Sequence, residues 1–238
     1  MVIIVADQET IQSSYRPGEC VSRVGLFGGT FDPVHRGHLH VALDVKNEFG
    51  LERVIVIPSA TPPHKAQKQV ADAMDRLAMT RLCFENLEGF VISDVELKRE
   101  GPSYTIDTIR YFLSQKSPGD ELMLIMGSDA FFEIHTWKAF GGILDQISLI
   151  VMKRPGLDGD MIEKAGPYLW KHIEQGYRFF ENERCYGHAL KKPVYFFEVS
   201  PWPMSSTEIR SRVKNGLDIA SFVPENVEAY IRNKGLYI

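Results

Sequence analysis

The chain has 238 residues, a length that fits one or two domains and suffices to bury a core without disulfides or a structural metal. Apolar residues make up 44% of it and charged residues 24%, as is usual for globular domains. With 27 Lys and Arg against 31 Asp and Glu, the formal net charge is −4. That charge argues against a protein dedicated to duplex nucleic acid or to an anionic membrane, but it allows a local basic pocket for one anionic ligand.

The cysteines and the apolar segments indicate a cytoplasmic protein. Cys20, Cys83 and Cys185 are odd in number and far apart, and no C-x-x-C pair occurs, so they predict neither a disulfide framework nor a zinc site. No apolar stretch approaches the roughly 20 residues that a membrane-spanning helix needs. The apolar run Val2–Val5 is too short for a secretory signal and lacks a basic start. We therefore expect a reducing compartment and no membrane partner.

Apolar runs and helical repeats alternate along the chain, which is typical of an α/β fold. Strands are expected at Val21–Phe27, Val54–Ile57, Phe90–Ile92, Leu122–Met126, Ile147–Met152 and Val194–Val199. Helices are expected at His38–Phe49, Ala71–Leu87, Thr105–Leu113, 131–140, 168–175, Ser206–Lys214 and Glu225–Asn233. Because the strands have no polar interior residues, we predict a Rossmann-like, doubly wound parallel sheet in a single domain with C-terminal helices.

The domain is expected to comprise residues 21–238. Residues 1–20 are assigned to an N-terminal extension of unknown role, in which Val2–Val5 forms either an edge strand or a disordered start. Residues 157–193 have the least regular pattern in the chain. Nothing in the composition divides the chain into two domains.

A glycine- and histidine-rich segment, GGTFDPVHRGH at 28–38, joins the first strand to its helix. In an open α/β sheet this turn lies at the carboxyl edge, where glycines and a helix N-terminus let backbone N–H groups approach a phosphate. His35 and His38 are three residues apart, so both imidazoles can face one anion and donate hydrogen bonds to it. Asp32 and Pro33 are expected to shape the turn, and His40 to be an ordinary residue of the helix face.

A second polar segment, SSTE at 205–208, predicts the start of a helix with Ser205 as N-cap. Arg210 and Arg212 follow close to the positive end of that helix, where cations are mildly unfavourable. A bound anion explains this placement, and the alternative is that Glu208 compensates two solvated arginines. We select Arg210 as the anion ligand and expect Arg212 at the surface.

Both segments resemble signatures of the nucleotidyltransferase superfamily, whose members transfer a nucleoside monophosphate from a nucleoside triphosphate. The first is similar to G-x-F-x-P-x-H-x-G-H, and the second to I-S-S-T-x-I-R, with Met204 in place of the first Ile. The resemblance identifies the catalytic residues as His35, His38 and Arg210. It also implies that ATP contacts Gly28, Gly29, Thr30, Phe31, Ser205, Ser206 and Thr207.

Four further segments resemble the bacterial nicotinate mononucleotide adenylyltransferases. PSATPPHK at 58–65 is similar to that family's P-x-x-x-P-P-H-K loop, and GPSYT at 101–105 with Thr108 to its G-x-S-Y-T-x-x-T segment. MGSD at 126–129 with Trp137 is similar to its G-x-D and following Trp, and RPG at 154–156 to its R-P-G. The resemblance runs from about residue 24 to Tyr237, leaves residues 1–20 unexplained and matches 157–193 weakly.

This resemblance implies adenylyl transfer from ATP to nicotinate mononucleotide, which gives deamido-NAD and pyrophosphate as a step of NAD biosynthesis. Residues 21–238 are then a nucleotidyltransferase domain, and Mg²⁺ is expected to arrive with ATP, since the chain shows no compact carboxylate cluster for a metal. The implied mononucleotide-binding residues are Lys65, Tyr104, Thr105, Trp137 and Arg154.

Two of these side chains admit a structural alternative. Asp129, just past a strand end, can accept hydrogen bonds from the ATP ribose or can cap the next helix. Trp137 can stack on the electron-poor pyridine ring or belong to the core. The N–H groups at the start of the Thr105 helix can hold the nicotinate carboxylate.

The main alternative is the same chemistry on nicotinamide mononucleotide, which differs in charge at one substituent. The Pro-Pro-His-Lys loop and Trp137 disfavour phosphopantetheine or cytidylyl transfer, and the missing G-x-G-x-x-G disfavours a dehydrogenase. A non-catalytic nucleotide sensor on this scaffold would be expected to have lost a motif histidine or arginine, and none is lost. We expect ATP and nicotinate mononucleotide as partners and no nucleic acid; a homo-oligomer is compatible with the sequence, which does not fix the oligomeric state.

Overall fold

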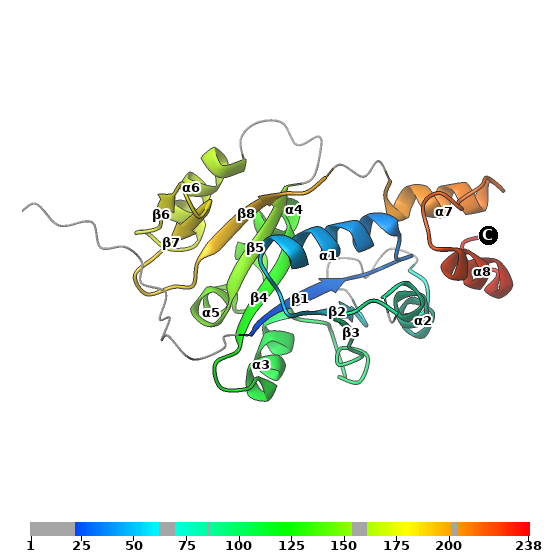
Figure 1. Ribbon diagram of the computed structural model, residues 1–238, viewed down its shortest axis with the longest axis horizontal. Helices are drawn as coiled ribbons and strands as arrows, with labels where there is room; N and C mark the ends of the chain where they lie inside the picture. The colour runs from blue at the N-terminus through cyan, green and yellow to red at the C-terminus, as the bar shows by residue number, and fades with distance from the viewer. Residues whose placement is uncertain (1–21, 62–69, 85, 154–160, 201–203) are drawn as a thin grey trace, which may run out of the picture.

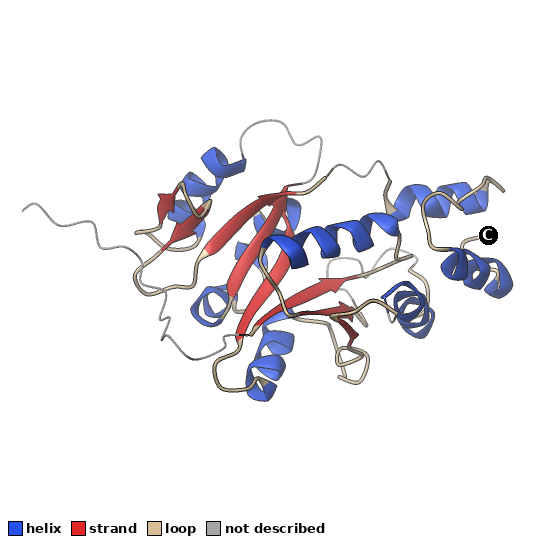
Figure 2. Ribbon diagram, viewed as in Figure 1, coloured by secondary structure: helices blue, strands red, loops and turns tan. Residues whose placement is uncertain are grey.

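The computed structural model describes residues 22–61, 70–84, 86–153, 161–200 and 204–238. It is a single twisted sheet with helices on both of its faces (Figures 1 and 2). The predicted extension 1–20 and the predicted ligands Lys65 and Arg154 lie outside the described residues. Within the described ranges, no helix is long and apolar enough to cross a membrane.

Eight strands form the sheet in the order β3-β2-β1-β4-β5-β8-β7-β6. Their bounds are β1 (Arg23–Gly29), β2 (Arg53–Pro58), β3 (Phe90–Ile92), β4 (Glu121–Gly127), β5 (Ser148–Lys153), β6 (Arg178–Phe180), β7 (Cys185–Gly187) and β8 (Val194–Glu198). All pairs from β3 to β8 are parallel, which confirms the doubly wound parallel sheet. The sequence interpretation missed β6 and β7, a short antiparallel extension at one edge.

The helices are α1 (Arg36–Glu48), α2 (Ala73–Phe84), α3 (Thr105–Gln115), α4 (Ser128–Phe131), the 3-10 turn η2 (Ile134–Thr136), α5 (Phe140–Gln146), α6 (Met161–His172), α7 (Ser206–Lys214) and α8 (Glu225–Lys234). The predicted helix at 131–140 is wrong. Trp137 has extended backbone, and Ala139 has a left-handed φ of 50°, so the segment breaks into two short turns and the start of α5. The helix expected at 168–175 begins earlier, at Met161, and ends at His172.

Two hydrophobic cores cover the two faces of the sheet. Successive side chains of a strand point to opposite faces, so Phe27 of β1 joins one core while Val24 and Leu26 join the other. The first core takes in α1, α2, α7 and α8, and Figure 1 shows α1 crossing that face. The second core takes in α3, α5 and α6. Burial on both faces explains why the central strands are almost wholly apolar.

The helices that follow β1 and β4 pack on opposite faces of the sheet. The connection after β1 leads to α1 on the first core, whereas the connection after β4 leads to α5 on the second. The carboxyl ends of two such strands diverge into a crevice, which is where open α/β sheets bind ligands. The segments that start at Gly28 and at Gly127 both begin at this point.

Candidate active site

The two glycines that end β1 have different surroundings. A Cβ built at Gly29 would lie 2.8 and 2.9 Å from ring atoms of Phe31, so that aromatic ring covers the glycine directly. A Cβ built at Gly28 would meet nothing within 4 Å, so Gly28 borders open space. Gly28 is therefore the residue of this turn at which a ligand can come closest to the backbone.

Phe31 supports the turn from inside. Its side chain is 2% exposed and makes edge contacts with the rings of Phe27 and His38, at centroid distances of 5.6 and 5.1 Å. Its φ of 49° is left-handed, which is an uncommon conformation for a bulky residue. Phe31 was expected among the ATP-binding residues, and its burial leaves only its backbone available to a ligand.

The two motif histidines lie together at the start of α1. His35 is the N-cap residue, and its backbone N–H donates to Nδ1 of His38 at 3.2 Å. The two rings lie with centroids 3.8 Å apart at an interplanar angle of 34°. Because Nδ1 of His38 accepts a hydrogen bond, the neutral ring carries its hydrogen on Nε2 and can donate it to an anion.

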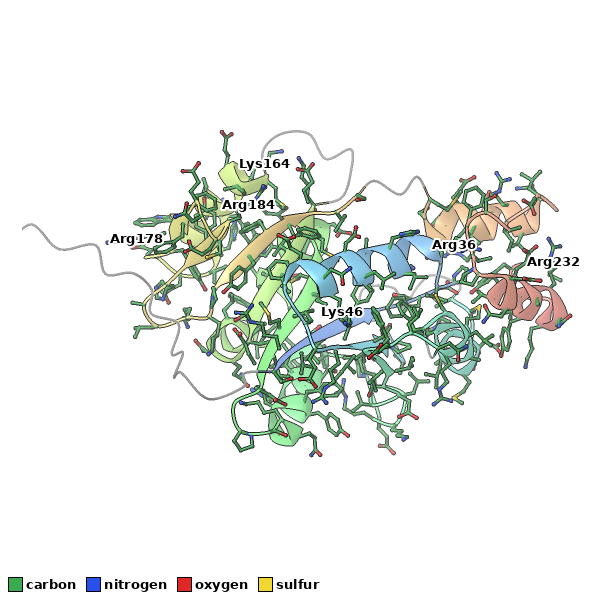
Figure 3. The ribbon with its side chains drawn as sticks, viewed as in Figure 1. Arg36, Lys46, Lys164, Arg178, Arg184 and Arg232 are labelled. Carbon is green, nitrogen blue, oxygen red and sulfur yellow. The ribbon has the colours of Figure 1, made fainter. Side chains whose placement is uncertain are left out.

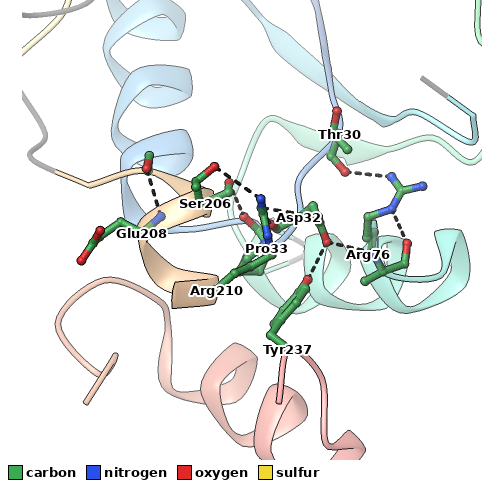
Figure 4. Close-up of polar contacts among 11 residues, drawn as sticks. Thr30, Asp32, Pro33, Arg76, Ser206, Glu208, Arg210 and Tyr237 are labelled. Carbon is green, nitrogen blue, oxygen red and sulfur yellow. Dashed lines mark hydrogen bonds and ion pairs between the residues drawn. The ribbon is translucent and has the colours of Figure 1, made fainter. Parts of the chain in front are cut away.

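Helix α7 is hydrogen-bonded to the turn that precedes these histidines. Ser205 caps α7 by accepting from the Glu208 N–H at 3.2 Å, which confirms the predicted N-cap. The Ser206 hydroxyl then donates to the carbonyl of Pro33 at 2.9 Å (Figure 4). Nearby, the Arg36 N–H at the start of α1 donates to the segment that follows α7, and Figure 3 shows Arg36 at the α7 end of α1.

Arg210 is held by the same turn. Its Nη1 donates to the carbonyl oxygen of Asp32 at 2.6 Å and lies 3.5 Å from Oδ2 of that residue, while Nη2 lies 3.4 Å from the Thr207 hydroxyl. The first and second motifs, far apart in the sequence, thus meet at residues 32 and 33. Arg212, which was expected at the surface, is partly exposed, donates to the Asp218 carbonyl, and lies over the Phe222 ring.

Asp32 is the centre of a buried polar network. Its Oδ1 accepts from the hydroxyl of Tyr237 at 2.8 Å and from the N–H of Ala71 at 3.2 Å. Burial, and then the negative charge of Asp32, raise the pKa of Tyr237 above its usual range, so the hydroxyl remains a donor. This agrees with the expectation that Asp32 shapes the turn. The sequence interpretation missed Tyr237, because nothing local marks a contact across 205 residues.

A second residue that the sequence interpretation missed is Arg76 of α2, which is 1% exposed. Its guanidinium donates to the carbonyls of Thr30 at 2.8 Å, Ser59 at 2.6 Å, Ala60 at 2.9 Å and Ala71 at 3.0 Å. Desolvation is the main cause that lowers the pKa of this guanidinium. Arg76 therefore joins the loop after β1 to the loop after β2. The sequence does contain one signal for this role, because Arg76 is a charged residue in helical register with the buried apolar positions of α2.

The segment at 101–105 is tied to the loop after β2. The Ser103 hydroxyl accepts from the N–H groups of Ala60 at 3.0 Å and Thr61 at 3.3 Å, and its own N–H donates to the Thr61 carbonyl. Tyr104 is the N-cap residue of α3, and Thr105 is the first residue of the helix. These contacts place the start of α3 next to the carboxyl end of β2.

Lys138, the residue after Trp137, approaches the same helix start from the segment after β4. Trp137 is half-buried against the second core, so its core alternative holds for part of the side chain. The Lys138 ammonium lies 4.4 Å from the centroid of the Tyr104 ring and 2.9 Å from the carboxylate of Asp107. The sequence interpretation did not select Lys138.

Asp129 is exposed in the first turn of α4, directly after β4. The alternative that it caps this helix is wrong, because Gly127 occupies the N-cap position. An acidic side chain there still suits the positive helix end. Among the residues that the structure describes, no three His, Cys, Asp or Glu side chains converge as a metal site.

The sequence matches the cytidylyltransferase-like family over residues 26–212. Similar solved structures include those of the Plasmodium falciparum nicotinic acid mononucleotide adenylyltransferase complexed with NaAD and with APC. Their TM-scores are 0.68 and 0.67, at 17% identity, over 91% of this chain and 97% of theirs, a likeness that bears on the fold. The chain belongs to the cytidylyltransferase-like nucleotidyltransferases.

Curated relatives narrow the class. A protein from Desulfatibacillum aliphaticivorans named "Probable nicotinate-nucleotide adenylyltransferase" is 41% identical over 225 residues, which cover 91% of this chain and 100% of the relative. A protein of the same name from Moorella thermoacetica is 40% identical over 222 residues, 93% of each chain. Within its class, the chain belongs to the nicotinate-nucleotide adenylyltransferases.

Proposed function

We propose that this protein transfers the adenylyl group of ATP to nicotinate mononucleotide and releases pyrophosphate. The observation that carries the proposal is the meeting of two distant motifs at one turn. His35 and His38 follow the Asp32–Pro33 turn at the carboxyl end of β1, and Arg210 is bound to that turn from α7. The family of the chain supports the pyridine mononucleotide as acceptor.

The proposed reaction needs no general base. A phosphate oxygen of the mononucleotide attacks the α-phosphorus of ATP, a new phosphorus–oxygen bond forms, and the bond to the β-phosphate breaks to release pyrophosphate. The attacking phosphate is already largely anionic near neutral pH, because its second pKa is about 6. The protein must therefore bring two anions together and stabilise the charge of the transition state, which is achieved by positioning and fixed electrostatics.

On the ATP side we assign the α- and β-phosphates to the imidazoles of His35 and His38, and the leaving pyrophosphate to Arg210. We assign the phosphate contact of His38 to its Nε2–H, because Nδ1 accepts from the His35 N–H. The open space at Gly28 supports a close backbone approach of the triphosphate. Ser206 already donates its hydroxyl to Pro33, so its part in binding falls to the backbone N–H at the helix start.

The remaining predicted ATP ligands are Gly29, Thr30 and Phe31 through their backbone, Asp129 at the ribose, and Ser205 and Thr207 at the β- and γ-phosphates. A divalent cation, Mg²⁺ in our proposal, enters with ATP as part of the substrate. On the acceptor side we propose Lys65, Tyr104, Thr105, Trp137 and Arg154. Tyr104 and Thr105 at the start of α3, together with Trp137, are the described part of that set.

We further propose that residues 21–238 act as one nucleotidyltransferase domain, preceded by an extension at 1–20, and that the protein works in the cytoplasm. The single sheet supports the first point. Cys83 and Cys185 are free and buried, as suits a reducing compartment.

Product analysis tests the proposed function. The protein is incubated with MgATP and either nicotinate or nicotinamide mononucleotide, and dinucleotide and pyrophosphate are quantified by chromatography and a coupled assay. We expect one pyrophosphate per deamido-NAD, with nicotinate mononucleotide as the better acceptor. Faster turnover of nicotinamide mononucleotide would move the specificity to that acceptor, and absence of any dinucleotide would refute the transfer. His38→Ala should lose most of this activity, because it removes an assigned phosphate ligand. His40→Ala, at an exposed position of the same helix α1, is its matched control and should remain active.

A further inference from the structure

The chain returns to the active-site turn at its C-terminus. Helix α8 ends at Gly235, whose left-handed φ of 60° lets its N–H and that of Leu236 reach back to the last carbonyls of the helix. Tyr237 follows, itself with a left-handed φ of 66°, and its hydroxyl reaches Oδ1 of Asp32 at 2.8 Å (Figure 4). The penultimate residue of the chain thus contacts the turn on which both motifs meet.

The carboxylate of Asp32 is an unusual neighbour for a polyanion site. It is negatively charged and its side chain is only 6% exposed, so it opposes a nearby triphosphate unless it serves to hold a cation. The cation is Arg210, whose Nη1 contacts both the carbonyl oxygen and Oδ2 of residue 32. These contacts occupy Nη1, and Nη2 donates one hydrogen bond to the Thr207 hydroxyl at 3.4 Å, which leaves the Nε–H and the second N–H of Nη2 to bind an anion.

The orientation of that carboxylate is set by its other oxygen. The terminal torsion of Asp is broad, so the carboxylate rotates easily unless hydrogen bonds fix it. Oδ1 accepts from the Tyr237 hydroxyl at 2.8 Å and from the Ala71 N–H at 3.2 Å, and the tyrosine bond is the shorter. Fixing Oδ1 also fixes Oδ2, and hence the side from which Arg210 is held.

We propose that Tyr237 is a positioning residue for Arg210, which acts through Asp32 to hold the guanidinium in the orientation that binds the triphosphate. This inference rests on the proposed function, because it needs Arg210 to bind ATP. In this proposal Tyr237 acts on ATP only through Asp32 and Arg210. Its loss should therefore weaken ATP binding without affecting the acceptor or the chemical step.

Tyr230 provides a matched control. It lies on α8, and its hydroxyl donates to Oδ1 of Asp75 at 2.8 Å, the same bond at the same length as that of Tyr237. Asp75 lies on α2 and is also 3.7 Å from the Lys234 ammonium. Replacing either tyrosine by Phe removes one hydroxyl–carboxylate bond, and only the Tyr237 bond leads to Arg210.

The experiment compares Tyr237→Phe and Tyr230→Phe with the wild type for kcat, for both KM values and for thermal unfolding. Tyr237→Phe should raise the KM for ATP by about three- to tenfold, the size of one hydrogen bond, with kcat and the acceptor KM within about twofold. Tyr230→Phe should leave all three kinetic constants within about twofold, although both variants lose a comparable amount of stability.

A double-mutant cycle separates a route through Arg210 from a general disturbance. In an Arg210→Ala background, Tyr237→Phe should change the KM for ATP by less than about twofold. The positioning role is overturned if Tyr237→Phe has its full effect on the KM for ATP in the Arg210→Ala background, or if Tyr237→Phe alone leaves that KM unchanged. It is also overturned if Tyr230→Phe has an equal effect, or if Arg210→Ala binds ATP with normal affinity. If the wild type forms no dinucleotide, the proposed function itself fails, whereas each outcome above is read from an active wild type.

Discussion

The two glycines at the end of β1 allow stability and ligand binding to be separated within one turn. Gly28→Ala and Gly29→Ala add the same methyl group to adjacent residues, and neither glycine has a left-handed φ. The added Cβ meets nothing within 4 Å at Gly28 but lies 2.8 Å from the Phe31 ring at Gly29. We therefore expect opposite phenotypes from the same chemical change.

The magnitudes follow from these distances. At Gly29 the ring of Phe31 is 2% exposed and packed against other aromatic rings, so it cannot move aside freely, and overpacking should cost about 1–3 kcal/mol. For a chain of this size that corresponds to a fall in Tm of roughly 2–12 °C. At Gly28 the methyl group has room and reduces the freedom of the unfolded chain, so stability should stay equal or rise by up to about 1 kcal/mol.

Ligand binding should show the reverse order. The methyl group at Gly28 enters the open space that we assign to the triphosphate, and should raise the Kd of ATP by about tenfold or more. Thermal unfolding without ligand and titration calorimetry with MgATP measure the two quantities independently. A Gly28→Ala protein that binds ATP as tightly as the wild type, or that unfolds as early as Gly29→Ala, would refute the reasoning.

Three further changes test separate parts of the account. His38→Asn keeps an acceptor near the position of Nδ1, whereas His38→Gln keeps a donor near the position of Nε2. In steady-state assays kcat/KM should therefore fall by about 10²–10³ in the Asn variant and by less in the Gln variant. The reverse order would contradict Nε2 as the phosphate donor. In urea unfolding Arg76→Lys should lose about 2–4 kcal/mol of stability, because Arg76 joins the carbonyls of Thr30 and Ser59. The change Arg81→Lys, at an exposed residue of the same helix, should cost under about 1 kcal/mol, and equal losses would contradict the role of Arg76. Burial raises the pKa of Cys83 to about 12. In a Cys20→Ser variant, alkylation of Cys83 at pH 8 should therefore be far slower in the native than in the unfolded protein. Equal rates would contradict the burial of Cys83.

Regular elements were predictable where the sequence carries a strong periodic or capping signal. Helix α7 has the predicted N-cap Ser205 and the predicted bounds Ser206–Lys214, and the central strands lie within a few residues of their apolar runs. The helix expected at 131–140 failed because its aromatic spacing suits a helix, while the backbone at Ala139 is left-handed. The strands β6 and β7 have three residues each and are too short to produce a recognisable apolar run.

The sequence indicated the motif residues of the candidate site but not the residues that support them. His35, His38 and Arg210 stand in recognisable motifs, and the fold brings them to one turn. Tyr237 carries no local signal, and the only local signal of Arg76 is its register with the buried apolar positions of α2. Their partners Asp32 and Thr30 lie 205 and 46 positions away in the sequence. A single sequence contains no measure of such pairings, so they become visible only in coordinates.

The most direct test of the central claim is the crystal structure of the protein with a non-hydrolysable ATP analogue. We expect the triphosphate at the turn between β1 and α1, with His38 Nε2 about 3 Å from an α- or β-phosphate oxygen and the guanidinium of Arg210 at a similar distance from the β- or γ-phosphate. A triphosphate bound elsewhere on the protein, or bound at the turn with Arg210 directed away from it, would contradict the account.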